Sequence, residues 1–307
     1  MRLVFAGTPA AAVPALRLLA AHHEVAAVVT RPDAALGRKR VLTASPVAQA
    51  ATDLGIPVIR AARLDDAATE AITALGADLG VIVAYGGLVR EPLLSAPTHG
   101  WINLHFSLLP QWRGAAPVQR ALIAGDRRLG VSVFQLVPAL DAGDVFAMHE
   151  VDVPADSTAE VVLEVLAENG AHTTLEVVDA IAAGTATATP QSGEPSLAAK
   201  LSLEDGSLTW TEPLDAVFAR FRGVTPEPGA HTTIDGARLK ILDAAPADEG
   251  APRLAPGEIV GVKGGLLFGT GTDPLQVRRV QPAGKGAMNA ADWWRGLRDT
   301  HTVKAGS

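Results

Sequence analysis

Short apolar runs alternate with stretches of helical periodicity through the first part of the chain. Runs of this kind, bounded by Gly, Pro or charged residues, are typical of buried strands. Apolar strands separated by helices predict an α/β fold with a Rossmann-like, mostly parallel sheet covered on both faces. Pro14 lies inside the first predicted helix, so the regular part of that helix is expected to start there. The predicted strands are 3–6, 25–29, 57–59, 79–84, 101–104, 131–136 and 145–153, and the predicted helices are 8–21, 46–54, 67–75 and 157–183.

The pattern changes after residue 184. Residues 185–203 are rich in Thr, Pro, Ser and Gly and hold few large apolar side chains, which predicts a linker. Beyond it, short strand-like segments recur between turn signals such as Asp235-Gly236, a pattern typical of a small, OB-like β-barrel. We therefore expect two domains, 1–184 and 204–307. The predicted strands of the second are 208–211, 231–234, 239–242, 258–262, 266–269 and 275–280.

Composition excludes several classes of protein. The chain has 307 residues, 48% of them hydrophobic, and it has no cysteine, which excludes disulfides and thiolate metal sites. No apolar run reaches the roughly 18 residues needed to cross a bilayer. The apolar N-terminal stretch is interrupted by Gly7-Thr8-Pro9, Pro14 and Arg17, so it does not have the layout of an export signal. We expect a cytoplasmic protein without a membrane segment.

The net charge of −7 argues against a general polyanion binder. Residues 1–204 hold 14 Lys/Arg against 21 Asp/Glu, and residues 205–307 hold 12 of each. Any contact with nucleic acid must therefore be local. The densest basic cluster is Arg38-Lys39-Arg40, although such a cluster by itself is more often a solvated loop.

Candidate chemistry lies beside two of the predicted strands. Asn103 and His105 are two residues apart at a strand end, so their side chains point to the same face. Asp141 and Asp144 flank a glycine after another strand. Each feature alone has an ordinary explanation, as a capped strand end or as a turn.

Two further features carry little weight. Gly7-Thr8-Pro9 follows the first strand but lacks the patterns of nucleotide-binding loops. His22-His23 lacks the spacing of a metal-ligand pair, and we expect no metal site.

Together the candidate residues belong to a longer pattern. The chain reads Asn103-Leu-His105-Phe-Ser107-Leu-Leu-Pro110-Gln-Trp-Arg113-Gly114, and later Asp141-Ala-Gly-Asp144. In order and spacing this resembles the folate-dependent formyltransferase family, with its N-x-H, S-L-L-P-x-x-R-G and D-x-G-D elements. Other segments resemble the branch of the family that acts on methionyl-tRNA. They are residues 5–9, the basic insertion within 31–47, and residues 222–230 and 282–293 of the second domain.

The resemblance implies an activity and its catalytic residues. It implies transfer of the formyl group of 10-formyltetrahydrofolate to the amino group of methionine carried by initiator tRNA. Asn103 is expected to donate a hydrogen bond to the oxyanion, and His105 to donate a second. Asp141 is expected to hold the imidazole and to favour its charged form, since a nearby carboxylate raises the pKa of a histidine.

The resemblance also implies binding residues. The loop of Ser107, Leu108, Leu109 and Pro110 is expected to contact the pterin end of the folate. Tyr85 and Gly86, at the end of the neighbouring strand, are expected to line the same pocket. Arg38, Lys39 and Arg40 are expected to contact tRNA phosphates, and the C-terminal barrel to hold the RNA. We expect the chain to act as a monomer.

Other functions remain open on the sequence alone. The same catalytic half could serve a sugar-nucleotide formyltransferase, a purine-intermediate formyltransferase or a formyl-folate hydrolase. The purine enzyme would lack a second domain of this kind, and the sugar enzyme would lack the basic insertion near Arg38. A non-catalytic dinucleotide-binding module with an RNA-binding barrel is a different class of alternative. It predicts that Asn103→Ala and His105→Ala leave function intact.

Overall fold

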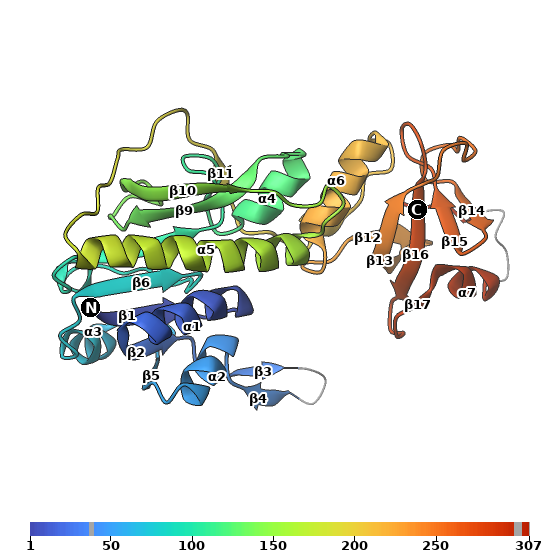
Figure 1. Cartoon of the computed structure of the whole chain (residues 1–307). Helices are drawn as coiled ribbons and strands as arrows, with labels where there is room; N and C mark the ends of the chain where they lie inside the picture. Colours follow the sequence, from blue (N-terminus) through green and yellow to red (C-terminus); the bar gives the residue numbers. More distant parts are fainter. Residues whose placement is uncertain (37–39, 298–302, 307) are drawn as a thin grey trace. The chain divides into compact units, whose positions relative to one another are not determined.

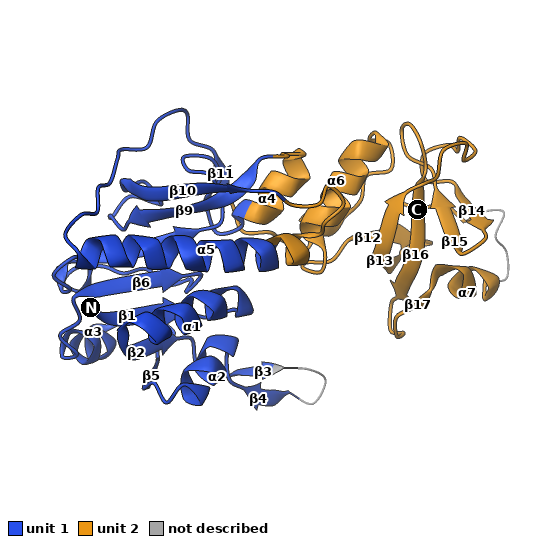
Figure 2. Ribbon diagram, viewed as in Figure 1, with its two compact units in different colours: residues 1–117, 128–152, 163–198 blue, residues 118–127, 153–162, 199–307 orange. Residues whose placement is uncertain are grey.

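The computed structural model describes residues 1–36, 40–297 and 303–306 of the chain (Figure 1). These residues form two compact units, and the chain passes between them several times (Figure 2). Unit 1 comprises residues 1–117, 128–152 and 163–198. Unit 2 comprises residues 118–127, 153–162 and 199–307.

Unit 1 is built on a seven-stranded sheet with the order β10-β9-β7-β6-β1-β2-β5. Five strands, from β5 to β7, are parallel to their neighbours, and β9 and β10 are antiparallel at one edge. The mostly parallel α/β sheet predicted from the apolar pattern is therefore confirmed. The strands are β1 Arg2–Gly7, β2 Glu24–Thr30, β5 Val58–Arg60, β6 Leu79–Val83, β7 Trp101–His105, β9 Leu129–Gln135 and β10 Val145–Val151.

Helices cover both faces of this sheet. On one face α5 packs against β7 so closely that a Cβ atom on Gly170 would lie 2.8 Å from Leu104. On the other face Ile72 of α3 and Leu93 of η2 pack with Val4 of β1. The helices are α1 Val13–His22, α2 Pro46–Asp53, α3 Asp66–Thr73 and α5 Ala159–Ala182, with 3-10 turns η1 Ala10–Ala12 and η2 Leu93–Ser95.

The predicted helices agree with the structure, with one difference at the N-terminus. The segment predicted as one helix from residue 8 begins with η1, and the regular helix α1 starts at Val13. Pro14 lies in the first turn of α1, where a proline breaks no intrahelical hydrogen bond. Among the helices of the described ranges, none has the length and apolar character that a membrane crossing requires.

The sequence pattern missed several short elements. The two-residue strands β8 and β11 pair with each other across a long stretch of chain, so no local alternation marks them. Helix α6 does carry a helical signal, because Val217, Phe221 and Val224 recur at i, i+4 and i+7 and are buried. The missed elements are the hairpin β3 Ala34–Leu36 and β4 Val41–Thr43, β8 Arg113–Gly114, β11 Leu197–Ala198, β17 Met288–Asn289, η3 Glu204–Gly206 and the helices α4 Pro117–Ala124, α6 Leu214–Val224 and α7 Ala290–Arg295.

Unit 2 contains a curled antiparallel half-barrel. Its sheet has the order β12-β13-β16-β15-β14, and β17 pairs with β16. The expected antiparallel barrel-type domain is thus confirmed. The strand predicted at 208–211 is wrong, because these residues are not in a strand and the preceding Ser207 forms only an isolated bridge to His231. Trp210 instead enters the core, where its Nε1 donates to Thr232 Oγ1 at 2.9 Å. The strands are β12 His231–Ile234, β13 Ala237–Pro246, β14 Ile259–Val262, β15 Gly265–Phe268 and β16 Leu275–Pro282.

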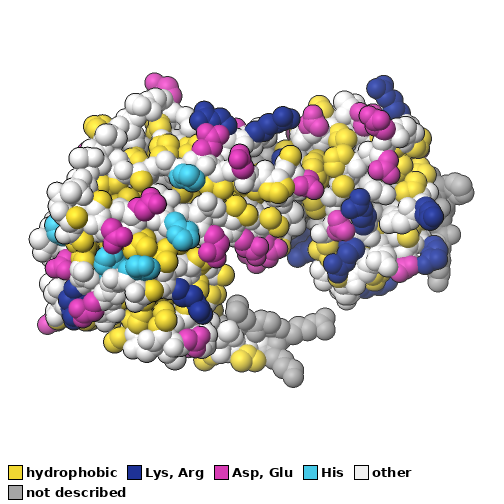
Figure 3. Space-filling view, viewed as in Figure 1, with side chains coloured by type: hydrophobic (Ala, Val, Ile, Leu, Met, Phe, Trp, Pro, Cys, Tyr) yellow, Lys and Arg dark blue, Asp and Glu magenta, His cyan; other side chains and the backbone are white. Residues whose placement is uncertain are grey.

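The core of unit 2 is apolar. Phe268 is fully buried and lies 5.0 Å from Trp210 between ring centroids. Helix α6 contributes Val217 and Phe221 to the same cluster, and α7 contributes Trp293. Basic side chains on the visible face of this unit are scattered among acidic ones rather than gathered in one patch (Figure 3).

Candidate active site

Strand β7 places Asn103 and His105 on one face of the sheet. Side chains alternate along a strand, so Trp101, Asn103 and His105 share the face opposite to Leu104, which contacts α5. His105 is buried, with 6% of its surface exposed, and Asn103 is half-buried. Both residues lie in β7, so the strand on which the predicted shared face depends is present.

The ring of His105 is held by the main chain of Trp112. His105 Nε2 lies 2.9 Å from the Trp112 carbonyl oxygen. A carbonyl only accepts hydrogen bonds, so Nε2 carries a proton and donates it. The edge of the ring also meets Phe134, with 6.4 Å between ring centroids. The second ring nitrogen, Nδ1, is left to face the carboxylate of Asp141.

The carboxylate of Asp141 reaches His105 from the loop between β9 and β10. Asp141 Oδ2 lies 3.9 Å from His105 Nδ1, which suits an ion pair with a protonated ring but is too long for a hydrogen bond. The same oxygen accepts a hydrogen bond from the main-chain N–H of Gly114 at 2.7 Å. In the structure the hydrogen bond to Trp112 orients the ring, and Asp141 lies near enough to act on the charge of the ring.

Burial determines the protonation state of this histidine. Loss of solvent lowers the pKa of His105 below its ordinary value of 6.5, and it outweighs the opposing effects of Asp141 and of the Trp112 hydrogen bond on that pKa. Asp141 thus acts in the predicted direction on the pKa, but the net shift is downward. The resting imidazole is neutral at neutral pH, with an unprotonated Nδ1.

Asn103 has a side-chain amide that is still able to donate. Within the described residues, no group forms a hydrogen bond with it. Half-buried polar groups usually have a partner, in the protein or in solvent. The amide is therefore available to a substrate oxygen on the face that it shares with His105.

The loop that follows β7 is held from β9. Ser132 is fully buried; its Oγ donates to the carbonyl of Ser107 at 2.7 Å and accepts from the N–H of Leu109 at 3.1 Å. Ser107 Oγ donates to the carbonyl of Gln111 at 2.6 Å, which closes the loop on itself. Leu109 is buried, whereas Leu108 is partly exposed, and the Leu109-Pro110 peptide is cis.

The loop that follows β6 exposes main chain rather than the tyrosine ring. Tyr85 is 1% exposed, and its hydroxyl donates to the carbonyl of Ala61 at 2.9 Å, inside the core. Gly86 is exposed, and its carbonyl accepts from Arg31 at 2.5 Å. Thr8, after β1, donates to the carbonyl of Tyr85 at 3.3 Å. The loops after three neighbouring strands therefore meet at the carboxyl edge of the sheet, where ligands of such sheets bind.

Comparison with known proteins relates the chain to one family over most of its length. Residues 1–178 match the family described as formyl transferase, and residues 200–298 match the formyl transferase C-terminal domain. The chain is 61% identical over 298 residues to a methionyl-tRNA formyltransferase from Clavibacter sepedonicus, covering 97% of each chain. It is 48% identical over 309 residues to a methionyl-tRNA formyltransferase from Mycobacterium sp. (strain KMS), covering 99% of this chain and all of that one.

The chain belongs to the methionyl-tRNA formyltransferase family.

Solved structures share the fold of this family. A methionyl-tRNA formyltransferase from Clostridium thermocellum matches 81% of this chain and 95% of its own, with a TM-score of 0.59 and 14% identity. An N-formyltransferase from Helicobacter canadensis, in complex with folinic acid and dTDP-3-aminofucose, matches 91% and 98% of the two chains, with a TM-score of 0.69 and 15% identity. HypX from Aquifex aeolicus in complex with tetrahydrofolic acid matches 96% of this chain with a TM-score of 0.66 and 18% identity, and this chain spans 47% of that protein.

The basic residues predicted to contact RNA are described only in part. Arg38 and Lys39 lie outside the described residues. Arg40 is exposed, with φ 49°, and immediately precedes β4. In the described part of the chain, no group of three or more His, Asp or Glu side chains is arranged to hold a metal ion.

Three residues near the site were missed from the sequence. They are Ser132, Gln191 and Ser196, whose side chains hydrogen-bond the loops that carry the predicted site residues. A serine inside the apolar run 131–134 is a readable signal, because a fully buried hydroxyl in a strand requires a partner. Gln191 and Ser196 lie in a polar segment, where nothing distinguishes them.

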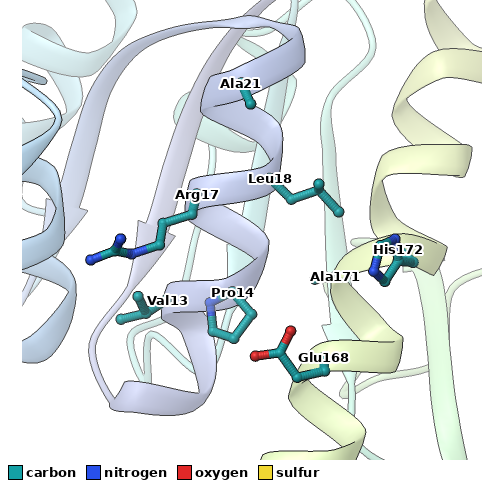
Figure 4. A pocket seen from close by; sticks show the side chains of 8 residues that line it. All are labelled: Val13, Pro14, Arg17, Leu18, Ala21, Glu168, Ala171 and His172. Atoms are coloured by element: carbon teal, nitrogen blue, oxygen red, sulfur yellow. The ribbon is translucent and has the colours of Figure 1, made fainter.

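A groove elsewhere in unit 1 contains none of these residues. It lies between α1 and α5 and has a volume of about 460 Å³. Figure 4 shows its lining, which is mostly apolar with a few charged or titratable side chains. The lining residues are Val13, Pro14, Arg17, Leu18, Ala21, Glu168, Ala171 and His172. The groove is therefore separate from the chemistry around His105.

Proposed function

We propose that the chain transfers the formyl group of 10-formyltetrahydrofolate to the α-amino group of methionine on initiator tRNA, in the cytoplasm and as a monomer. In this proposal, residues 1–184 bind the formyl-folate and catalyse the transfer, and residues 204–307 bind the tRNA. Residues 185–203 join the two. The observation that carries the proposal is the approach of Asp141 to His105, with Asn103 on the same strand as His105, in a chain that is 61% identical to a methionyl-tRNA formyltransferase.

The reaction needs positioning more than it needs an activated side chain. The amine nitrogen bonds to the formyl carbon, the bond from that carbon to folate N10 breaks, and one proton passes from the amine to N10. An α-amine has a pKa of about 8, so a useful fraction is neutral at neutral pH and can attack directly. The chain must stabilise the oxyanion of the tetrahedral intermediate and move the proton.

Each of the three catalytic residues has a role that suits its surroundings. The amide of Asn103, which has no hydrogen-bond partner in the described part of the chain, donates to the oxyanion. The neutral ring of His105 accepts the amine proton at Nδ1, because Nε2 is already engaged with Trp112. The carboxylate of Asp141, 3.9 Å from Nδ1, then stabilises the imidazolium that forms.

The folate is held by main-chain groups. The loop of Ser107, Leu108, Leu109 and Pro110 is fixed by Ser132, so its remaining polar groups are pre-arranged for the edge of a pterin. Tyr85 contributes through its backbone, since its ring is buried, and Gly86 through an exposed backbone without a side chain.

For tRNA, the proposal assigns phosphate contacts to Arg38, Lys39 and Arg40. On the face of unit 2 that Figure 3 shows, basic side chains are interspersed with acidic ones, so this short cluster supplies a local attraction that the net charge does not. We expect Arg38→Ala to raise the KM for methionyl-tRNA and to leave folate binding unchanged. Equal losses for both substrates would contradict this assignment.

A formylation assay tests the proposal directly. The protein is incubated with charged initiator tRNA and 10-formyltetrahydrofolate, and formylmethionyl-tRNA is measured for wild type and His105→Ala side by side. We expect product with wild type and a large loss with the variant. Formate without acylated tRNA would indicate a formyl-folate hydrolase, and transfer only to an amino sugar would indicate a sugar-nucleotide formyltransferase.

A further inference from the structure

A segment that is distant in sequence from the motifs at 103–114 and 141–144 lies against both motifs. We call residues 189–198 the strap. At one end, Thr189 and Val145 exchange two main-chain hydrogen bonds of 2.8 and 3.0 Å. At the other end, β11 of the strap pairs with β8. The strap is therefore anchored on unit 1 at both ends, and the side chains between the anchors have defined positions.

Gln191 of the strap holds the loop of Asp141. Its Nε2 donates to the carbonyl of Asp141 at 2.8 Å and to the carbonyl of Gly143 at 2.9 Å. Both amide protons are used on one short loop. The loop that carries the carboxylate is thus held by its backbone, while Gly114 holds the carboxylate itself at 2.7 Å.

Arg113 determines which way the amide of Gln191 points. Its Nη2 and Nε donate to Gln191 Oε1 at 2.7 and 3.2 Å. A guanidinium only donates and a carbonyl only accepts, so the oxygen must face Arg113 and the nitrogen must face the Asp141 loop. No other orientation of the amide satisfies both neighbours.

The Asp141 loop requires such support. Asp141 has φ 44°, in the left-handed region that costs a non-glycine residue on the order of 1–3 kcal/mol unless its surroundings compensate. Trp112, which holds His105, also has a positive φ, of 61°. Its N–H donates to Ser196 Oγ of the strap at 2.8 Å. Both members of the His105–Asp141 pair are therefore held by strained backbone that the strap contacts.

Gly114 allows the strap to come this close. Its φ is 125°, and a Cβ atom at this position would lie 2.7 Å from the carbonyl oxygen of Ala198. The adjacent Arg113 and Gly114 of the sequence motif thus have three functions here. Arg113 orients Gln191, the Gly114 N–H binds the carboxylate of Asp141, and the missing side chain admits the strap.

We propose that the strap is part of the catalytic apparatus, in which Gln191 is a positioning residue that keeps the Asp141 carboxylate facing His105. Ser196 likewise fixes the backbone of Trp112, whose carbonyl orients His105. This inference rests on the proposed formyl transfer. Gln191 itself touches neither substrate nor reacting atoms in this scheme. Its loss should lower kcat, because a small misplacement of a catalytic group can cost up to about 10²-fold in rate.

Two substitutions at Gln191 separate its two contacts. Gln191→Met removes every hydrogen bond with little change in size. Gln191→Glu keeps an acceptor for Arg113, as an ion pair, but turns its second acceptor oxygen toward the carbonyls of Asp141 and Gly143. We expect both variants to lose about 10-fold or more in kcat, with KM for folate and tRNA within about twofold of wild type. Wild-type activity in Gln191→Glu would overturn the proposal, since it would show that only the contact with Arg113 matters.

Gln135 provides the matched control. It too is a half-buried glutamine whose Nε2 bridges two carbonyls, of Trp101 at 2.9 Å and of His99 at 3.4 Å, but its side chain is not bonded to the Asp141 loop. Gln135→Met should lose a similar amount of thermal stability and keep wild-type kcat. If Gln135→Met lost as much kcat as Gln191→Met, the loss would reflect general destabilisation of the protein, and the proposal would be overturned.

A second readout follows the imidazole directly. The chain has eight histidines, so the NMR resonance of His105 is assigned as the one that is absent from the spectrum of His105→Asn. Asp141 raises the pKa of His105, so displacing its carboxylate in Gln191→Met should lower that pKa further. An unchanged pKa together with unchanged kcat would refute the strap's role while leaving formyl transfer by wild type intact. Absence of transfer by wild type would instead refute the proposed function.

Discussion

The surroundings of His105 in unit 1 and the core of the half-barrel in unit 2 are held together by different forces. Around the site, the buried groups His105, Ser107 and Ser132 each hydrogen-bond to main-chain atoms of a loop. In the half-barrel, Phe268 and Trp210 pack against each other, with their rings tilted, inside an apolar cluster. Directional bonds set orientation and contribute modest net stability, whereas apolar burial contributes stability without setting direction. Substitutions in the two regions should therefore separate activity from stability.

The largest effect on activity is expected at His105. His105→Ala removes the proton acceptor, and general acid–base catalysis typically contributes about 10²–10⁴-fold, so kcat should fall by that order. The thermal midpoint should fall as well, because the buried ring loses its hydrogen bond to Trp112 and its contact with Phe134, so kcat is compared at a temperature where both proteins are folded. Steady-state formylation and thermal unfolding measure the two quantities. The exposed His149, varied to Ala, is the control and should keep its activity.

The largest effect on stability is expected in the half-barrel. Phe268 is fully buried, and Phe→Ala substitutions in cores cost about 3–5 kcal/mol. Denaturant unfolding should show this loss in Phe268→Ala, while kcat at low temperature stays near wild type. Leu203, which is 48% exposed, provides a control that should change the free energy of unfolding by less than about 0.5 kcal/mol. A selective loss of kcat in Phe268→Ala would remove the distinction between the two regions.

A smaller effect is expected at Ser132. Ser132→Ala leaves the N–H of Leu109 without its acceptor, and an unsatisfied buried group costs about 1–3 kcal/mol. The loop after β7 should lose its order, so the KM for formyl-folate should rise by about 5- to 100-fold with a smaller change in kcat. Isothermal titration with tetrahydrofolate gives the affinity independently. Ser95→Ala, at an exposed serine, should bind folate like wild type.

The smallest effect concerns pH. Burial lowers the pKa of His105, so the unfolded chain takes up this proton more readily than the folded one. The stability that the neutral ring contributes is complete above the unfolded pKa of 6.5 and is lost as the pH falls below it toward the folded pKa. As the pH is lowered from 7 to below 6.5, the free energy of unfolding should therefore fall less in His105→Asn than in wild type. Denaturant titrations across that range measure the difference, and equal slopes for the two proteins would contradict it.

Much of the fold could be predicted because the signals are local. Apolar runs bounded by Gly and Pro gave seven strands of unit 1 within a few residues of their observed ends, and the strand 231–234 in unit 2 coincides with β12. The pleat of a strand alone places Asn103 and His105 on one face. The failures have physical reasons. The run 208–211 is apolar because Trp210 fills the core, not because it pairs in a sheet.

The candidate site was only partly readable. The order of Asn103, His105 and Asp141 along the chain indicated the family, since motif spacing is a property of the sequence. The side-chain direction of Tyr85 was not readable, because a strand-end tyrosine can face a pocket or the core with equal ease. The net pKa of His105 was not readable either, because burial depends on all the elements packed around it.

The sequence by itself determined the class of fold, the alternation that sets the faces of β7, and the motifs that identify the family. Only the tertiary structure decided how the site is held. Gln191 meets Asp141 across 50 residues, and Ser196 meets Trp112 across 84. Contacts over such distances arise from where the folded backbone passes, and the polar composition of residues 185–203 contains no sign of them. The physical reason is that periodicity records which side of an element is buried, whereas hydrogen-bond partners are chosen only when distant segments meet.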